Sequence, residues 1–288
     1  YTLPGACADW KFSTDDFARN DAITTIQNPG DQGILLESTL NNATAPCNSS
    51  PKFLVRPVPY FCVGQTVQIS VGASDAEGDS LVYSFATPRS DNGANVTFVA
   101  PYSQNQPFGS STPITLNQST GTITFTPNQV QVAIMTIRID EYRNGVLIGS
   151  VLRDFQIVIS GSGCNNQLPT ASGINGVPNQ FVINGCAGKP LNFTITTADA
   201  NASDSVWVVI GGNVPGATIT SSGGNRPTIT FDWTATVPQI STQPYIFSVT
   251  VFDNNCPYSG QQSYTYRIFI NKIATVTVAA TEVCVGEP

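Results

Sequence analysis

The chain has 288 residues, of which 41% are hydrophobic and 11% are charged, and its formal net charge is −7. That apolar content is enough for a packed core in each of two or three domains. Twelve basic and nineteen acidic residues argue against a nucleic-acid partner, because phosphate contacts need clustered Lys and Arg. No run of about 18 apolar residues occurs, so no membrane span is predicted. Because the chain has no histidine, it cannot form a Ser-His-Asp or Cys-His site, and we expect no enzyme activity.

The first 46 residues predict strands at 9–13, 22–26 and 34–40, with a turn at Asn28-Pro29-Gly30-Asp31 between the last two. They do not contain the unit that repeats in the rest of the chain. We therefore expect residues 1–46 to be the closing strands of a preceding β-domain.

From residue 47 onward a unit repeats. The sequences Cys62-Val63-Gly64 and Cys186-Ala187-Gly188 are each followed, at the same distance, by an aspartate, and the string TITF occurs at 122–125 and again at 228–231. The opening recurs at Cys284-Val285-Gly286. These copies are too long for solenoid repeats and fit whole β-domains strung in a line. The predicted domains are 47–163 and 164–271, with the start of a further repeat at 272–288.

Each copy contains short alternating runs separated by turn residues, which is the pattern of an Ig-like sandwich. The fold class predicted is therefore all-β, with tandem antiparallel β-sandwiches. An Asn-Gly pair at 144–145 predicts a hairpin between the last two strands of the first copy. The predicted strands are 67–71, 80–86, 96–99, 123–126, 134–140 and 155–159 in the first copy, and 191–196, 205–210, 228–232, 245–252 and 264–270 in the second.

The cysteines predict oxidised pairs in an exported protein, because a cytosolic metal or thiol site would usually include His or a C-x-x-C pair. Two pairings are compatible with the sequence: Cys47 with Cys62 and Cys164 with Cys186, or Cys7 with Cys47 and Cys186 with Cys256. The sequence does not decide between them. We expect the odd cysteine to pair with a residue beyond Pro288. The seven cysteines are Cys7, Cys47, Cys62, Cys164, Cys186, Cys256 and Cys284.

Several runs resemble the PKD-like and Ig-like repeats of very large Bacteroidota surface proteins. They are Ala22-Ile23-Thr24, Leu40-Asn41-Asn42, Asn48-Ser49-Ser50-Pro51, residues 58–62, residues 75–84 and residues 141–145. The resemblance covers most of residues 1–160 and is looser after residue 164. It implies tandem PKD/cadherin-like sandwiches in an extracellular stalk or filament at the cell surface, exported by the type IX system and associated with gliding motility and adhesion.

The turn at Asp75-Ala76-Glu77-Gly78-Asp79 resembles the D-x-D-G-D-like turn of cadherin-related domains, where carboxylates bind calcium. Hard oxygen ligands suit Ca²⁺, and Asp140 at the end of a later strand could add another. The candidate calcium ligands are therefore Asp75, Glu77, Asp79 and Asp140. An ordinary turn capped by aspartate is the alternative that we favour here. The second copy, at 199–204, lacks counterparts of Glu77 and Gly78, so calcium is less expected there.

Ser80 and Ser205 follow aspartates at nearly equivalent repeat positions. Each setting resembles the Asp-Ser/Thr-apolar motif on which Bacteroidota attach O-glycans, which makes both serines candidate glycan sites and the chain a candidate glycoprotein. Chance occurrence in a Ser-rich chain is the alternative.

Four aromatic residues could form a sugar-stacking platform: Trp10, Tyr83, Trp207 and Trp233. Tyr83 and Trp207 lie at the same distance from the repeat cysteines, which favours equivalent core positions between two sheets.

The function predicted is a non-catalytic structural and adhesive segment of an extracellular multi-domain surface fibre or stalk. Its expected partners are neighbouring repeats, surface polysaccharide and other cell-surface proteins. The alternative is a set of carbohydrate-binding or spacer modules of a secreted polysaccharide-degrading enzyme. Self-assembly through an exposed edge strand is a third hypothesis.

Overall fold

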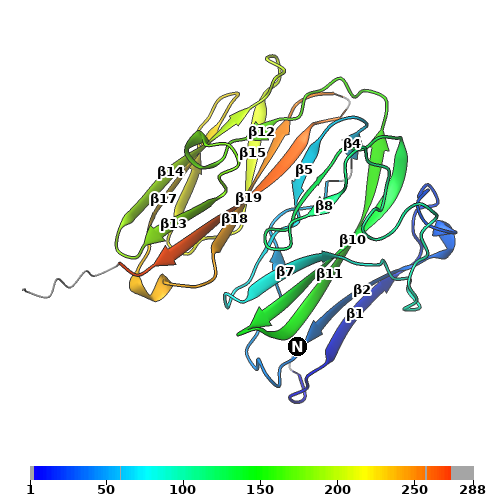
Figure 1. Cartoon of the computed structure of the whole chain (residues 1–288), viewed down its shortest axis with the longest axis horizontal. Helices are drawn as coiled ribbons and strands as arrows, with labels where there is room; N and C mark the ends of the chain where they lie inside the picture. Colours follow the sequence, from blue (N-terminus) through cyan, green and yellow to red (C-terminus); the bar gives the residue numbers. More distant parts are fainter. Residues whose placement is uncertain (1–2, 59, 257, 274–288) are drawn as a thin grey trace, which may run out of the picture.

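The computed structural model describes residues 3–58, 60–256 and 258–273, and it confirms an all-β protein made of two Ig-like β-sandwiches in tandem (Figure 1). The predicted start of a further repeat at 272–288, including Cys284, lies almost wholly outside the described residues. Within the described ranges no helix is long and apolar enough to cross a bilayer. Short 3₁₀ turns lie at η1 (Pro29–Asp31), η2 (Ile174–Gly176) and η3 (Val237–Gln239).

The first sandwich packs a large sheet, in the order β1-β2-β11-β10-β7 with β4 also paired to β11, against the smaller sheet β5-β9-β8. Side chains from both sheets fill its core, including Tyr83, Phe125 and Ile137, each at most 1% exposed. Its strands are β1 (Trp10–Asp16), β2 (Ile34–Leu40), β3 (Lys52–Phe53), β4 (Tyr60–Cys62), β5 (Val67–Ser70), β6 (Ala73–Ser74), β7 (Ser80–Phe85), β8 (Thr115–Leu116), β9 (Thr122–Phe125), β10 (Gln131–Arg143) and β11 (Val146–Ser160).

The second sandwich packs the sheet β12-β14-β17-β16 against the sheet β13-β19-β18-β15. The TITF strings of the two copies occupy β9 and β17, and the Ile and Phe of both strings are fully buried. The strands are β12 (Thr170–Ala171), β13 (Val182–Cys186), β14 (Pro190–Ala198), β15 (Val206–Gly211), β16 (Thr218–Ser221), β17 (Thr228–Thr234), β18 (Tyr245–Asp253) and β19 (Gln261–Asn271).

Strands β1 and β2 belong to the first sandwich, so the prediction that residues 1–46 close a preceding domain is wrong. Strand β2 pairs antiparallel with β11. The Arg19 guanidinium donates to both carboxylate oxygens of Asp154 at 2.8 and 3.0 Å, with both side chains almost fully buried. Ile23 and Ile26 pack in a small core with β10. A strand pattern indicates that a segment is extended but does not specify the sheet that it joins.

The predicted hairpin is confirmed. Asn144 and Gly145 have φ angles of 52° and 79°, and Arg143 is paired with Val146 across the turn. Two central residues with positive φ define a type I′ turn, for which Asn-Gly is the favoured sequence. The expected strands at 22–26 and 96–99 are absent as regular strands in the described part of the chain and are joined by the isolated bridge between Ile26 and Phe98.

Tyr83 and Trp207 are not equivalent, contrary to the prediction. In the first sandwich Tyr83 is paired with Ile139, two residues before Glu141; in the second, Val208 is paired with Val251, two residues before Asp253. The acidic turn of the second copy is one residue longer, which shifts the register, and a shift of one residue moves a side chain to the opposite face. Trp207 is therefore 45% exposed, whereas Tyr83 and Trp233 are buried in the cores.

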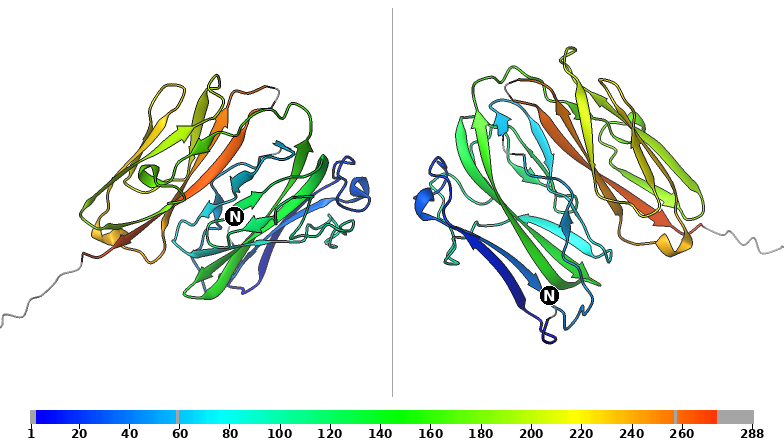
Figure 2. Two further views of the ribbon diagram at one scale, coloured as in Figure 1. Left: turned by 45° about the horizontal axis from the view of Figure 1, so that its top comes forward. Right: turned by 180° about the vertical axis from the view of Figure 1, so that it is seen from behind.

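The two sandwiches pack side by side, with β5 of the first next to β19 of the second (Figure 1 and Figure 2). The Ser70 amide donates to Ser263 Oγ at 2.6 Å, and the Ser70 and Thr265 hydroxyls are hydrogen-bonded at 2.5 Å; these three side chains are buried. The backbones also approach closely, since a Cβ on Gly211 would lie 2.3 Å from the Leu54 carbonyl oxygen.

The disulfide joins Cys62 to Cys164, so the two expected pairings are both wrong. Strand β4 runs parallel to the end of β11, with Cys62 beside Ser160, and the chain then turns back to bring Cys164 to Cys62. This parallel pairing could not be derived from cysteine spacing. In the described residues, Cys7, Cys47, Cys186 and Cys256 are free thiols.

Candidate metal centres

Each sandwich carries a cluster of three carboxylates at corresponding positions. In the first, Asp75, Asp79 and Glu141 each offer an oxygen atom, and these oxygens lie within 4.8 Å of one another. In the second, Asp199, Asp204 and Asp253 do the same. In both clusters, two acids come from the turn before β7 or β15, and the third comes from the neighbouring strand, β10 or β18.

The turn of the first cluster is shaped by Asp75. Its Oδ1 accepts hydrogen bonds from the backbone amides of Glu77 at 3.0 Å and Asp79 at 2.8 Å. Its Oδ2 is buried and has no hydrogen-bond donor. One oxygen of Asp75 thus holds the turn, while the other remains available to a ligand.

Glu141 enters the first cluster from β10. Its side chain is 1% exposed, and its Oε2 accepts a hydrogen bond from Asn48 Nδ2 at 3.0 Å. Its Oε1 is buried and unpartnered. Burial raises the pKa of Glu141 to about 8; the Asn48 amide opposes this shift, and the nearby Asp75 adds to it.

Of the four predicted calcium ligands, the structure brings Asp75 and Asp79 together but leaves Glu77 and Asp140 outside the cluster. Glu77 is exposed and accepts hydrogen bonds from the amide and hydroxyl of Ser49 at 3.2 and 3.0 Å. Asp140 points to the other face of β10 and accepts a hydrogen bond from Arg138 Nε at 2.6 Å.

Glu141 was missed by the sequence reasoning, although a signal was available. Ile137 and Ile139 are completely buried, and side chains on a strand alternate between its two faces. Glu141 continues the series by two residues and therefore faces the same side as both isoleucines.

A guanidinium group balances part of the first cluster. Arg143 donates to both oxygens of Asp79, with Nη2 to Oδ2 at 2.5 Å and Nε to Oδ1 at 2.8 Å. This contact raises the pKa of Arg143. When all three acids are ionised, the single arginine leaves two negative charges uncompensated.

The second cluster repeats this arrangement. Asp199 Oδ1 accepts a hydrogen bond from the Asn201 amide at 2.8 Å, and its Oδ2 is buried without a donor. Asp253 is completely buried and accepts hydrogen bonds from the backbone amides of Asn255 at 3.0 Å and Gly260 at 2.7 Å. Burial raises the pKa of Asp199, and the adjacent Asp253 contributes.

Asn166 occupies in the second cluster the role of Asn48 in the first. Its Nδ2 donates to Asp253 Oδ2 at 2.6 Å; its side chain is 4% exposed, and its Oδ1 is buried and unpartnered. Arg226 supplies the guanidinium, which donates to the main-chain oxygens of Asn201 at 3.0 Å and Asp204. Glu77 and Gly78 are not residues of the first cluster. The lack of their counterparts in the second copy is therefore no reason to expect calcium less there.

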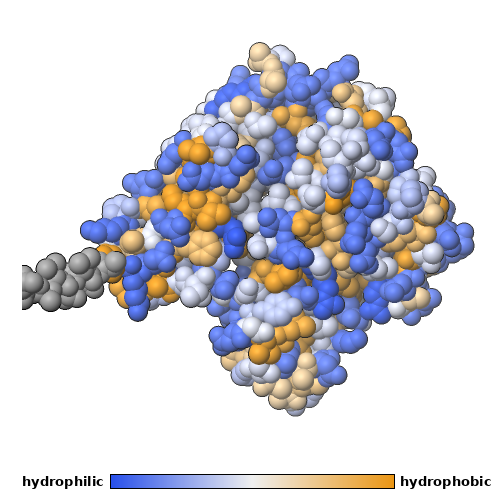
Figure 3. All heavy atoms as spheres, in the orientation of Figure 1, coloured by the Kyte–Doolittle hydropathy of each residue, from blue (hydrophilic) through white to orange (hydrophobic). Residues whose placement is uncertain are grey.

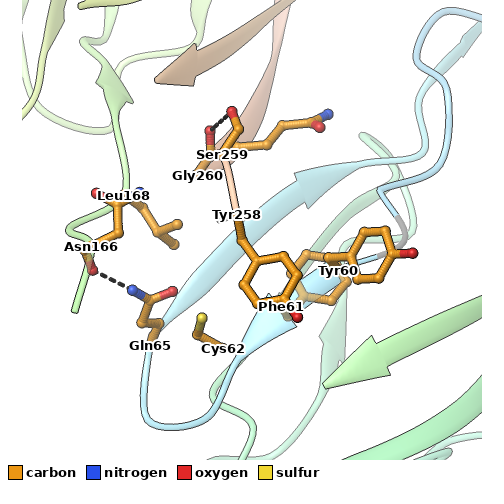
Figure 4. Close-up of a pocket in the computed structure, with 10 residues that line it drawn as sticks. Tyr60, Phe61, Cys62, Gln65, Asn166, Leu168, Tyr258, Ser259 and Gly260 are labelled. Carbon is orange, nitrogen blue, oxygen red and sulfur yellow. Dashed lines mark hydrogen bonds between the residues drawn. The ribbon is translucent and has the colours of Figure 1, made fainter. Parts of the chain in front are cut away.

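A small crevice between the sandwiches adjoins the second cluster (Figure 4). In it, Gln65 of the first sandwich donates to the main-chain oxygen of Asn166, and the rings of Tyr60 and Tyr258 stack with centroids 5.8 Å apart. Its lining contains no carboxylate. Asn166 thus contacts the first sandwich through its backbone and the second cluster through its side chain.

The candidate glycan sites lie next to the clusters. Ser80 opens β7 directly after Asp79, and Ser205 precedes β15 directly after Asp204. Both serines are half-buried. Their modification stays a prediction.

Solved structures with similar folds have low overall similarity. Extracellular cadherin domains 1–5 of protocadherin gamma B2 match at 14% identity and a TM-score of 0.27, covering 92% of this chain and 53% of that one. A tandem pair of titin Ig domains matches at 12% identity and a TM-score of 0.25, covering 78% of this chain and 100% of the titin pair. An endo-fucoidan hydrolase of glycoside hydrolase family 107 matches at 14% identity and a TM-score of 0.24, covering 92% of this chain and 39% of the hydrolase. These TM-scores are too low to support any functional argument.

No protein-family model and no curated protein matches the chain. The chain spans about half the length of the protocadherin fragment. Its function must therefore be inferred from its own residues.

Proposed function

We propose that the chain is a structural and adhesive, non-catalytic segment of an extracellular multi-domain surface fibre or stalk. The observation that carries this proposal is the way in which the two sandwiches and the segment between them are held together. The Cys62–Cys164 disulfide ties the first sandwich to the connecting segment, and buried hydrogen bonds from Ser70 to Ser263 and Thr265 join the two flanks. These directional bonds lie in a buried contact where the backbones also approach closely, which favours one fixed orientation of the two sandwiches and hence a rigid element.

The disulfide also provides a path for tension. It closes a segment with a sequence separation of 102 residues, which contains strands β5 to β11. When the ends of the chain are pulled apart, force that reaches Cys62 passes through the sulfur atoms to Cys164. The core of the first sandwich is then shielded from stretching, as a load-bearing segment requires.

An extracellular location follows from the same bond, because structural disulfides persist in oxidising compartments. Export by the type IX system and a role in gliding motility extend the proposal on the strength of the sequence resemblance. The face in Figure 3 has hydrophobic residues interspersed among polar ones, and repeated weak contacts with polysaccharide or surface proteins would supply adhesion through multivalency.

Immunogold electron microscopy of intact source cells tests this function, with an antibody raised against residues 47–271. We expect label along fibres that project from the cell, and loss of the label when the antibody is first absorbed with the purified chain. Antigen absent from the cell surface, and found in the medium on a chain that degrades polysaccharide, would overturn the proposal and favour modules of a secreted enzyme.

A further inference from the structure

We propose that the chain binds divalent cations of the Ca²⁺ type at two equivalent sites, one formed by Asp75, Asp79 and Glu141 and the other by Asp199, Asp204 and Asp253. This inference is independent of the proposed fibre function.

The first argument comes from buried oxygen atoms rather than from the clustering of acids. Glu141 Oε1 and Asp75 Oδ2 are both buried and lack a hydrogen-bond donor, and the Glu141 side chain is 1% exposed. A buried carboxylate oxygen without a partner is strongly unfavourable. A cation between these oxygens would satisfy both.

The second site has the same deficit. Asp199 Oδ2 is buried without a partner, and so is Oδ1 of Asn166, whose side chain is 4% exposed and contacts Asp253. The unpartnered Oδ2 of Asp199 corresponds to that of Asp75 in the first site, although the two turns differ in sequence and length. The second unpartnered oxygen belongs to Asn166 here and to Glu141 in the first site, because both oxygens of Asp253 already accept hydrogen bonds.

Charge indicates the valence of the ligand. Each cluster has three carboxylates and one nearby guanidinium: Arg143 is ion-paired with Asp79 in the first, and Arg226 donates to main-chain oxygens of the turn in the second. When the acids are ionised, two negative charges remain at each site. A divalent cation neutralises both, whereas a single shared proton neutralises one.

Ligand chemistry indicates the class of metal. The chain has no histidine, and both clusters consist of carboxylates with a neighbouring asparagine amide. Oxygen-only sites suit hard cations rather than zinc or copper. The ligands come from turns of unequal length, and Ca²⁺ accepts such irregular geometry more readily than Mg²⁺, which demands a near-ideal octahedron.

The second site lies at the junction between the sandwiches. Asn166 contacts Asp253 through its side chain and accepts a hydrogen bond from Gln65 of the first sandwich at its main-chain oxygen. A cation bound there would hold the connecting segment against the second sandwich, and the first site would hold Asn48 in the corresponding way.

Calcium titration of the chelator-treated full chain by isothermal calorimetry tests the proposal. We expect two binding equivalents for the parent, and one for each of Glu141→Gln and Asp199→Asn, with Kd at the altered site weakened by at least about tenfold. Both substitutions preserve size and can keep the existing hydrogen bonds to Asn48 and Asn201. Glu77→Gln and Asp140→Asn are matched controls that remove nearby carboxylates outside the cluster, and we expect both to retain two equivalents.

Thermal unfolding in chelator and in calcium distinguishes a loss of calcium binding from a defect in folding. Glu141→Gln replaces a buried carboxyl group that lacks a partner at Oε1 with a neutral amide of the same size, so its Tm in chelator should equal or exceed that of the parent. Calcium should raise the parent Tm by several degrees and raise that of Glu141→Gln less, because binding to the native state stabilises it. The proposal is overturned if the parent gives neither a calcium heat nor a Tm shift, if the controls lose binding as Glu141→Gln does, or if Mg²⁺ binds more tightly than Ca²⁺.

Discussion

The two sandwiches share a strand pairing and differ in what lies beyond it. In the first, β4 runs parallel to β11, and β10 pairs with β7; in the second, β13 runs parallel to β19, and β18 pairs with β15. Strand β18 ends at Asp253, which is the one acid that this strand contributes to the second cluster. Strand β10 passes the corresponding Glu141 and continues into the Asn144-Gly145 hairpin.

This extension changes what the sheet can bind. The added length of β11 offers an edge that β2 covers, with Gly149, Ser150 and Val151 as the paired residues. Capping an edge strand prevents its pairing with other chains. In the second sandwich, the outer face of the corresponding sheet is used instead to dock on β5. The same repeat therefore supports two different neighbours, because its hairpin is long in one copy and short in the other.

The largest expected effect contrasts Tyr83 with Trp207, which lie at the same distance from the repeat cysteines. Tyr83→Ala should lower the free energy of unfolding by about 3–5 kcal/mol, because it empties a core site and removes the hydroxyl that accepts a hydrogen bond from the Ala73 amide at 2.8 Å. Trp207→Ala should cost about 1 kcal/mol, because that side chain is 45% exposed. Urea denaturation measures both. Equal losses would contradict the register described for the two sandwiches.

The next effect concerns the attachment of the N-terminal strands, which has no counterpart in the second sandwich. Arg19→Ala should lower the free energy of unfolding by about 3 kcal/mol, because Asp154 is left as a buried charge without its partner. Hydrogen exchange should rise in β1, β2 and β11 and remain unchanged in β14 and β17. Lys11→Ala is the control, since its exposed amino group lies 3.8 Å from a carboxylate oxygen of Glu37 in a solvent-accessible pair; a loss as large as that of Arg19→Ala would contradict the argument.

Local features were predictable from the sequence because they depend on short-range physics. The Asn-Gly turn needs only positive φ angles, and the TITF strings need only alternation. Local patterns of this kind were sufficient to predict the fold class and most strand positions. Features that depend on distant partners were not predictable: β2 joining β11, β4 lying parallel to β11, and the resulting Cys62–Cys164 bond.

The acidic clusters lie between these two cases. Asp75 and Asp79 followed from the turn sequence, whereas Glu141 required the register of β7 on β10. Reasoning by motif selected the adjacent Asp140, which points to the opposite face. In the second copy, Asp204 was recognised as nearly equivalent to Asp79, but Asp253 was missed for the same reason as Glu141, because it enters the cluster from the neighbouring strand β18.

The disulfide should shield strands β5 to β11 of the first sandwich from force and leave the second sandwich unshielded. In single-molecule pulling from the chain ends, reduction should release the segment between Cys62 and Cys164, adding a contour length of about 350 Å for a separation of 102 residues. A Cys62→Ser, Cys164→Ser variant should show this longer extension without reductant and lose about 2–4 kcal/mol of stability. The unfolding step of the second sandwich should be the same in all samples; an extension that does not respond to reduction would contradict the tension path.

The smallest effect addresses the contact between the two sandwiches. Ser263→Ala removes the hydroxyl that accepts a hydrogen bond from the Ser70 amide at 2.6 Å, and it leaves that buried amide without this partner, at a cost of about 1–2 kcal/mol. Because the loss falls on the interface rather than on either core, the radius of gyration from X-ray scattering should increase while each sandwich keeps its folded signature. Ser222→Ala is the control, since that exposed serine directly follows β16, which belongs to the sheet of the second sandwich that does not contain β19. Unchanged scattering with a lowered Tm for Ser263→Ala would mean that the serine supports the second core alone, and that the other contacts between β5 and β19 are sufficient to hold the two sandwiches together.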